Sequence, residues 1–179
     1  MALRKLKRTS RVLLFAFAGV LGLAVNAETI GFKDGYEIDR WNDSEITGGT
    51  TEINGITIDG MTLSAEFLYT VRLNGGGVTA RTADYTVSVP GNGTVTFDWE
   101  YTGNHRFYRA FAEFHVIVNG EEVLTLVDST SFANFNFSGV DQTIAVKAGD
   151  TFGFRIGGSN FDSNSALDGL LRISRLTHL

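Results

Sequence analysis

Apolar and polar residues alternate with a period of two along much of the chain after residue 27. In the segment 94–101 the odd-numbered positions are Val, Phe, Trp and Tyr, whereas the even-numbered positions hold threonine or an acidic residue. This alternation is typical of a strand with one buried face in an antiparallel sheet. No segment combines helical spacing of apolar residues with capping residues. The sequence therefore predicts an all-β protein.

Short alternating segments separated by glycine- and asparagine-rich turns predict the individual strands. They are Ile30–Phe32, Ile56–Ile58, Thr62–Tyr69, Asp84–Val89, Thr94–Tyr101, Arg109–Val118, Glu122–Val127, Ala133–Phe137, Thr143–Val146, Thr151–Ile156 and Leu170–Leu176. Asn119-Gly120 predicts a tight hairpin, because both central residues of a type I′ turn need a positive φ angle. Pro90-Gly-Asn-Gly93 predicts a second turn. We therefore expect one antiparallel β-sandwich domain, of jelly-roll type, over residues 28–179.

The first 27 residues have the order of a secretory signal peptide. The segment 1–11 carries five basic residues and no acidic one, an apolar run follows from Val12 to Ala24, and Val25-Asn-Ala27 ends in a small residue. The apolar run is shorter than the roughly 20 residues of a spanning helix, so a cleaved signal is favoured over an uncleaved anchor. We expect a mature chain that begins at Glu28, is not inserted in the membrane, and resides outside the cell, in the periplasm or at the cell surface.

The charge of the mature chain restricts its partners. The whole sequence has 15 basic and 20 acidic residues, a net charge of −5. All five basic residues of the leader would be lost on export, which leaves ten basic against 20 acidic residues and a net charge near −10. Such a surface repels nucleic acid and anionic lipid. The chain also has no cysteine, so disulfides, zinc-thiolate sites and cysteine nucleophiles are excluded.

Three segments of the second half carry a family resemblance. They are Gly93-Thr-Val-Thr-Phe-Asp-Trp-Glu-Tyr-Thr102, Ala148-Gly-Asp-Thr-Phe-Gly-Phe-Arg-Ile156 and Leu170-Leu-Arg-Ile-Ser-Arg-Leu176. Together they resemble the β-sandwich that is common among exosortase-sorted (PEP-CTERM) envelope proteins of bacteria. The resemblance covers about half of the mature chain and implies a bacterial secreted sandwich, without implying a chemistry. No sorting motif follows Leu176, so we expect release or surface association rather than exosortase processing.

Two acidic loops are candidates for a structural calcium ion. Asp162, Asn164 and Asp168 lie in a glycine-flanked segment before the last predicted strand. Oxygen ligands at alternating loop positions suit calcium, although the glycine and glutamate of an EF-hand are missing. By analogy with sandwich modules that bind calcium near the amino end, Glu37 and Asp39 could share one ion with Asp168. The alternative is a solvated asparagine- and aspartate-rich turn.

A second group of candidates consists of aromatic and polar side chains in predicted loops. Trp41 lies between polar residues, and no alternation predicts its burial. The predicted loop 102–109 contains His105, Arg106, Phe107 and Tyr108. Aromatic rings that stack on sugar rings, with arginine bonding the hydroxyls, would suit such loops. The alternative is that these residues only anchor the loops.

Catalysis has the weakest support among the function classes. Asp98 and Glu100 share one strand face, as the two carboxylates of a glycosidase would share a cleft, but exposed strand faces commonly carry such acids. No nucleophile elbow, metalloprotease motif or phosphate-binding loop occurs. We therefore predict a secreted, non-catalytic module that binds carbohydrate or an extracellular matrix polymer. The alternative is a structural or adhesive component that contacts other envelope proteins, and a glycan-active enzyme is the third hypothesis.

Overall fold

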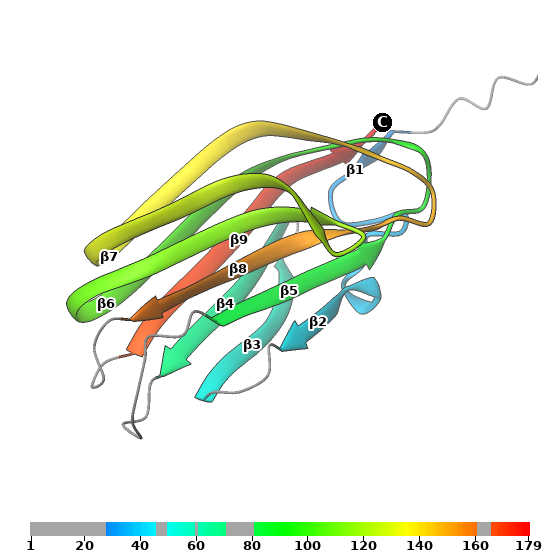
Figure 1. The fold of residues 1–179 in the computed structure, drawn as a ribbon. Helices are drawn as coiled ribbons and strands as arrows, with labels where there is room; N and C mark the ends of the chain where they lie inside the picture. The colour runs from blue at the N-terminus through cyan, green and yellow to red at the C-terminus, as the bar shows by residue number, and fades with distance from the viewer. Residues whose placement is uncertain (1–27, 46–49, 60, 71–80, 161–165) are drawn as a thin grey trace, which may run out of the picture.

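Strands form nearly all of the structure, a computed structural model that describes residues 28–45, 50–59, 61–70, 81–160 and 166–179. Of residues 45, 50–58, 66–70, 81, 105–110, 130–133, 159, 160 and 166 only the backbone is described. The elements are β1 (Thr29–Ile30), the 3-10 helix η1 (Ile38–Arg40), β2 (Asn42–Glu45), β3 (Thr50–Asp59), β4 (Thr62–Thr70), β5 (Arg81–Ser88), β6 (Gly93–Val118), β7 (Glu121–Val146), β8 (Thr151–Asn160) and β9 (Ala166–His178) (Figure 1). No helix in these ranges has the length and apolar character needed to cross a bilayer. The predicted all-β class is confirmed.

The strands form two antiparallel sheets, and β6 and β7 take part in both. One sheet has the order β3-β4-β9-β6-β7, and the other has the order β2-β5-β8-β6-β7. The first half of β6 pairs with β9 from Val95 to His105, and its second half pairs with β8 from Ala110 to Val118. The long ribbon of β6 and β7 therefore folds over one side of the sandwich and closes it (Figure 1).

The pairing pattern is that of a jelly roll. β4 pairs with β9, β5 pairs with β8, and β6 pairs with β7, so the strand pairs are nested along the sequence. One long antiparallel ribbon is thus wound into two facing sheets, as in jelly-roll sandwiches. The predicted sandwich is therefore confirmed. The number of strands differs, because five of the short strands predicted between residues 94 and 146 are parts of the two long strands.

The segment predicted as a loop, residues 102–109, lies within β6. Its prediction as an ordinary loop is wrong, although the backbone is irregular there. Pairing with β7 is interrupted between Asn104 and Arg109, and in the same stretch β6 leaves β9 and reaches β8. The polar residues that suggested a loop therefore mark the place where one strand passes from one sheet to the other.

The predicted Asn119-Gly120 hairpin is confirmed. These two residues join β6 to β7, and their φ angles are 54° and 83°. Two consecutive positive φ values are what a type I′ turn requires. The side chain of Asn119 also ties this turn to the neighbouring one, because its amide donates to Asp150 over 2.9 Å and its carbonyl accepts from the Thr151 N–H.

The core between the sheets is rich in aromatic rings. Phe97, Trp99 and Tyr101 point inward from β6 and are buried, as the alternation predicted. Phe97 lies edge-on to Phe154 with ring centroids 5.1 Å apart, and Tyr101 donates from its hydroxyl to the carbonyl of Gly157 across the sandwich. Burial of such rings is the main source of stability in a domain without disulfides.

A bulge near the end of β9 changes which face its last residues occupy. Between the pairs Thr96–Thr177 and Asp98–Ser174 the register shifts, and Arg175 has a φ angle of 51°. Leu171 and Ile173 are buried before the bulge, and Leu176 and His178 are buried after it. Because a bulge inserts one extra residue, it moves the inward face from odd to even positions. The bulge is what turns His178 into the interior.

Candidate functional site

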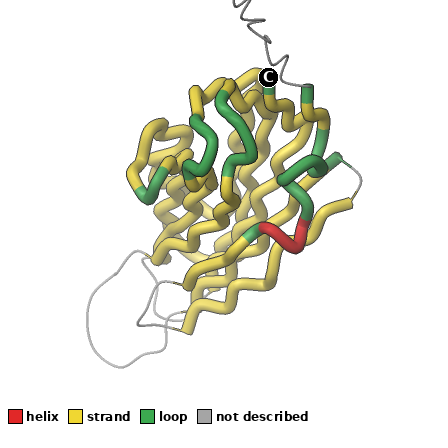
Figure 2. The backbone as a smooth tube through the Cα atoms, turned by 90° about the vertical axis from the view of Figure 1, so that its right-hand side faces the viewer, coloured by secondary structure: helices red, strands yellow, loops and turns green. Residues whose placement is uncertain are grey.

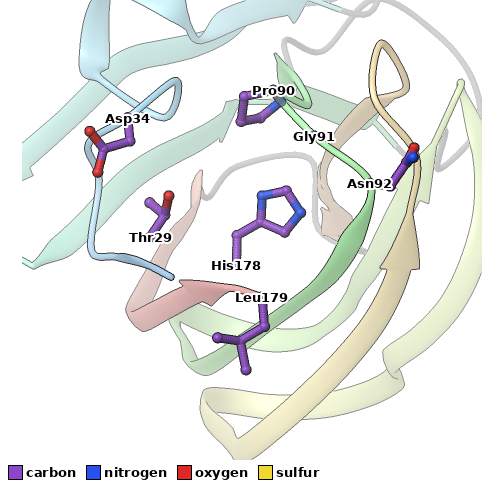
Figure 3. Close-up of a pocket in the computed structure, with 7 residues that line it drawn as sticks. All are labelled: Thr29, Asp34, Pro90, Gly91, Asn92, His178 and Leu179. Atoms are coloured by element: carbon purple, nitrogen blue, oxygen red, sulfur yellow. The ribbon is translucent and has the colours of Figure 1, made fainter. Parts of the chain in front are cut away.

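A pocket lies at the end of the sandwich where the C-terminus and several described loops gather (Figure 2). Its volume is about 340 Å³. Three segments that are distant in sequence form it: β1 with the loop after it, the turn between β5 and β6, and the end of β9. The lining residues are Thr29, Asp34, Pro90, Gly91, Asn92, His178 and Leu179 (Figure 3).

The imidazole of His178 stands at the centre of this pocket (Figure 3). His178 pairs with Val95 of β6 on one side and with Thr29 of β1 on the other, so two neighbouring strands fix its backbone. Only 7% of the residue is exposed, and this burial lowers the pKa of the imidazole below its usual value of 6.5. The ring is therefore neutral at pH 7.

Tyr36 holds one edge of the His178 ring. The Tyr36 hydroxyl lies 3.3 Å from His178 Nδ1, and the two rings meet edge to face with centroids 5.8 Å apart. Burial raises the pKa of Tyr36 to about 12, so its hydroxyl keeps its proton. When this hydroxyl donates to Nδ1, the neutral imidazole carries its own proton on Nε2.

The other nitrogen of this ring, Nε2 of His178, is buried and has no hydrogen-bond partner among the described residues. Buried polar atoms without a partner are rare, and each costs about 1–3 kcal/mol. The backbone packs closely along this edge of the ring. A Cβ atom at Gly93 would lie 2.8 Å from Nε2 and collide with the Leu179 carbonyl, and one at Gly91 would lie 3.8 Å from the ring.

The walls of the pocket are two tight turns. On one side, Asp34 and Gly35 have φ angles of 53° and 107°, and a Cβ atom at Gly35 would lie 2.9 Å from the ring of Pro90. On the other side, the side-chain oxygen Oδ1 of Asn92 accepts the Ala148 N–H over 2.9 Å, which ties the Pro90–Asn92 turn to the β7–β8 turn. Figure 3 shows His178 between these walls, with Asp34 and Asn92 on opposite sides.

Trp41 lies beneath the pocket loop, and its prediction as an exposed ligand platform is wrong. The residue is 8% exposed, its ring stacks on Phe154 with centroids 5.8 Å apart, and its Nε1–H donates to the Tyr36 carbonyl over 3.0 Å. The polar neighbours of Trp41 in sequence gave no sign of this, because burial comes from a strand more than 100 residues away. Trp41 anchors the loop that carries Asp34 and Tyr36.

The prediction that Glu37 and Asp39 share a calcium ion with Asp168 is wrong. Glu37 accepts from the Gly35 N–H over 2.9 Å and pairs with Arg40 over 3.0 Å, next to Tyr36 and therefore near His178. Asp168 is exposed and precedes His178 by ten residues along β9, which is on the order of 33 Å of strand. Their carboxylates lie at opposite ends of the sandwich.

Asp162 and Asn164 lie outside the described residues, so the part of the calcium prediction that rests on them stays a prediction. In the described ranges, no three His, Asp or Glu side chains are grouped so that they could hold a metal ion. Exposed Asp168 pairs through its backbone with Leu68 of β4 and Asn104 of β6.

His105, Arg106, Phe107 and Tyr108 lie where β6 crosses between the sheets, at the end of the sandwich opposite to His178. His105 pairs with Leu167 near the start of β9. The side chains of these four residues are outside the described part of the structure, so their role in binding stays a prediction. Trp41 lies near the other end, because its indole bonds the Tyr36 carbonyl and Tyr36 contacts His178.

Asp98 and Glu100, the candidate catalytic pair, are held in ion pairs on the outer face of β6. Arg175 bonds Asp98 over 2.9 Å and Asp141 over 3.2 Å, and Arg172 bonds Glu100 over 3.2 Å. Asp98 also accepts the N–H of Asp141, a residue of β7 with a φ angle of 53°. Asp98 therefore joins the irregular part of β7 to the bulge in β9, which is a structural role.

A second polar cluster lies on the outer face of the other sheet. Arg155 of β8 bonds both oxygens of Asp84 over 2.7 and 2.8 Å and reaches Glu122 over 2.8 Å. The hydrogen bonds to Asp84 are the largest cause of a raised Arg155 pKa. His115 lies beside it, between Glu113 at 3.8 Å and Glu122 at 3.4 Å. Each side chain of this cluster has an ionisable partner within the cluster, so the cluster offers no unpaired side chain to a ligand.

Sequence reasoning missed the pocket. The two signals that pointed to it were the Pro90-Gly-Asn-Gly93 turn and the histidine at 178, and they are almost 90 residues apart. No periodicity places His178 inside, because the bulge at Arg175 interrupts the alternation. Thr29 and Asp34 lie in a third segment.

No protein-family model matches the chain, and no curated protein matches it either. Among solved structures, TmCBM61 in complex with β-1,4-galactotriose gives a TM-score of 0.37 at 11% identity, covering 83% of this chain and 93% of that chain. The N-terminal cellulose-binding domain of Cellulomonas fimi β-1,4-glucanase C gives 0.34 at 12%, covering 76% and 87%. The family 11 carbohydrate-binding module from Clostridium thermocellum with a β-1,3-1,4-mixed-linked tetrasaccharide gives 0.32 at 14%, covering 85% and 95%. Likeness at these TM-scores carries no conclusion about this chain.

Proposed function

We propose that this chain is a secreted, non-catalytic β-sandwich module that binds carbohydrate. The observation that carries the proposal is the lining of the pocket, which offers the polar side chains of Thr29, Asp34 and Asn92 beside the ring of Pro90 and holds no lysine or arginine.

A sugar hydroxyl suits the pocket because it both donates and accepts. It can therefore bond to a group that only accepts and to a group that does both. The Asp34 carboxylate accepts further hydroxyl hydrogens, and the Thr29 hydroxyl can do either. The ring of Pro90 adds an apolar surface for the C–H groups of a sugar.

Charged ligands fit this pocket poorly. Its lining contains no lysine or arginine, its one ionised side chain is Asp34, and the chain carries a net charge of −5. An anion would meet repulsion from Asp34, because unit charges of like sign repel strongly at short range. A metal ion would find one carboxylate and no grouped set of ligands in the described ranges. The ligand class that suits this pocket is therefore a neutral molecule with several hydroxyl groups.

The test is a glycan array followed by titration calorimetry with the sugars that bind. We expect binding of at least one neutral sugar, and we expect His178→Gln to weaken it about tenfold, because the His178 side chain lines the pocket. His115→Gln is the matched control, since His115 is equally buried and lies outside the pocket. An array without any bound glycan would refute the proposal.

A second candidate function, contact with another envelope protein, is favoured by β7. This strand pairs with β6 alone over its 26 residues, so no described strand covers its outer edge. Such edges bind extended segments of other chains. A photo-crosslinking side chain at exposed Thr143 should then capture a defined partner on intact cells, whereas one at exposed Ile38 on η1 should not. Equal or absent capture from both positions would remove this candidate.

A further inference from the structure

We infer that the pocket takes the terminal sugar of a glycan end-on, so that the rest of the glycan leaves into solvent. This inference rests on the proposed function and names the part of the carbohydrate that is recognised.

The size of the pocket limits how much of a glycan it can hold. Its volume of about 340 Å³ is near the lower end of ligand pockets, which run from roughly 300 to 1,000 Å³. A pocket of this size holds only a short part of a glycan. A longer stretch of glycan would lie outside it.

The position of the pocket allows entry of a chain end and gives no path across a sheet. The His178 ring forms a floor that is backed by the buried Tyr36 ring. Asp34 and Asn92 lie on opposite sides of it (Figure 3), and the turn at Gly35 packs against Pro90 between them. An internal unit of a glycan has neighbours on both sides, and these would meet the floor or a wall. A terminal unit has one neighbour, which can point outward.

On the outer faces of both sheets, charged side chains among the described residues already pair with one another. On the face of β6 and β9, Arg175 and Arg172 pair with Asp98 and Glu100. On the face of β5 and β8, Arg155 pairs with Asp84. A glycan lying along a strand needs a row of rings or free hydrogen-bonding groups. A glycan bound along a strand would first have to break these ion pairs, so the pocket is favoured as the place where a glycan binds.

Two polar walls give the terminal sugar its orientation. Asp34 projects from one wall, and its carboxylate makes no ion pair with the described residues, in contrast to Glu37 three residues later. Because a carboxylate only accepts hydrogen bonds, it selects a sugar face with free hydroxyl groups. The free hydroxyls that distinguish a terminal unit from an internal one are therefore the groups that Asp34 would bond.

The experiment measures affinity as a function of glycan length, by calorimetry with the monosaccharide to the hexasaccharide of the sugar that binds on the array. End-on recognition predicts dissociation constants that agree within about threefold from the disaccharide upward, and one protein per glycan chain at every length. A derivative methylated on the hydroxyls of its terminal unit should lose binding at least about tenfold.

Paired variants connect the effect to the pocket. Asp34→Asn should weaken binding about tenfold, since asparagine tolerates the positive φ angle and removes only the charge. Asp39→Asn, an exposed acid on η1 outside the pocket, should change nothing. Affinity that rises tenfold or more with length, or that is unaffected by terminal methylation, would overturn end-on recognition alone. Absence of binding to every glycan would overturn the proposed function as well.

Discussion

His115 and His178 are buried almost equally, with 8% and 7% of each residue exposed, yet their surroundings differ. His115 lies on the outer face of a sheet, where its Nδ1 meets the Thr125 hydroxyl at 3.1 Å and carboxylates flank both nitrogens. His178 lies at the end of the sandwich, with Nδ1 near the Tyr36 hydroxyl and Nε2 buried without a partner among the described residues. Two histidines of equal burial therefore differ in the charged and polar groups around them.

The two regions also differ in how they are held. The sheet-face cluster around His115 depends on strand pairing and ion pairs between β5, β6, β7 and β8. The pocket depends on a loop anchored by Trp41 and on a bulge anchored by Asp98. Variants of these two anchors should therefore damage the pocket region and leave the other cluster largely intact.

The largest effect is expected for Trp41→Ala. Removal of a buried indole that stacks on Phe154 should lower the free energy of unfolding by about 3–5 kcal/mol. Denaturant unfolding measures this, and Ile38→Ala, at a half-exposed position in the same loop, should stay within about 0.5 kcal/mol of the wild type. A Trp41→Ala protein as stable as the Ile38→Ala protein would show that the loop is not anchored through this ring.

The next largest effect is expected for Asp98→Ala. Asp98 accepts the Asp141 N–H and bonds Arg175, with 15% of its side chain exposed, so its removal should cost about 1–3 kcal/mol. Glu100→Ala removes one exposed ion pair from the same strand and should cost no more than about 1 kcal/mol. Because the β9 bulge places His178, sugar affinity should fall in Asp98→Ala and hold in Glu100→Ala. Equal affinities in the two variants would contradict this connection.

The strands could be predicted from sequence because a period of two is a local property. The residues from Val95 to Tyr101 are buried on the predicted face, and Asn119-Gly120 forms the predicted turn. The continuity of β6 could not be predicted, because residues at a crossing between sheets lose their alternation and look like a loop. The burial of Trp41 and of His178 could not be predicted from the sequence, for a related reason. The burial of Trp41 depends on Phe154, and that of His178 depends on a bulge that the sequence does not mark.

A smaller effect is expected in the pH dependence of stability. Burial lowers the pKa of His178 in the folded state, so the unfolded state binds a proton more readily once the pH falls below about 6.5. His178 therefore stabilises the fold above that pH, and this contribution is lost on acidification. The melting temperature of the wild type should fall more between about pH 7.5 and about pH 5 than that of His178→Gln. Equal falls in both proteins would mean that the ring is readily protonated when folded.

The smallest effect is expected at Glu113, beside His115, and it has the opposite sign. Burial is the largest cause of a raised Glu113 pKa, and it outweighs the neighbouring His115, which lowers it. A carboxyl with a raised pKa contributes stability below its unfolded value near 4.5, and that contribution is lost as the pH rises through the folded value. Acidification should therefore favour the fold through Glu113 while it disfavours the fold through His178. Glu113→Gln should make the fall in melting temperature on acidification steeper than in the wild type, whereas His178→Gln makes it shallower. If Glu113→Gln also made it shallower, the His115 pairing would outweigh burial, and the sheet-face cluster would be a stabilising ion pair rather than a buried charge that the fold tolerates.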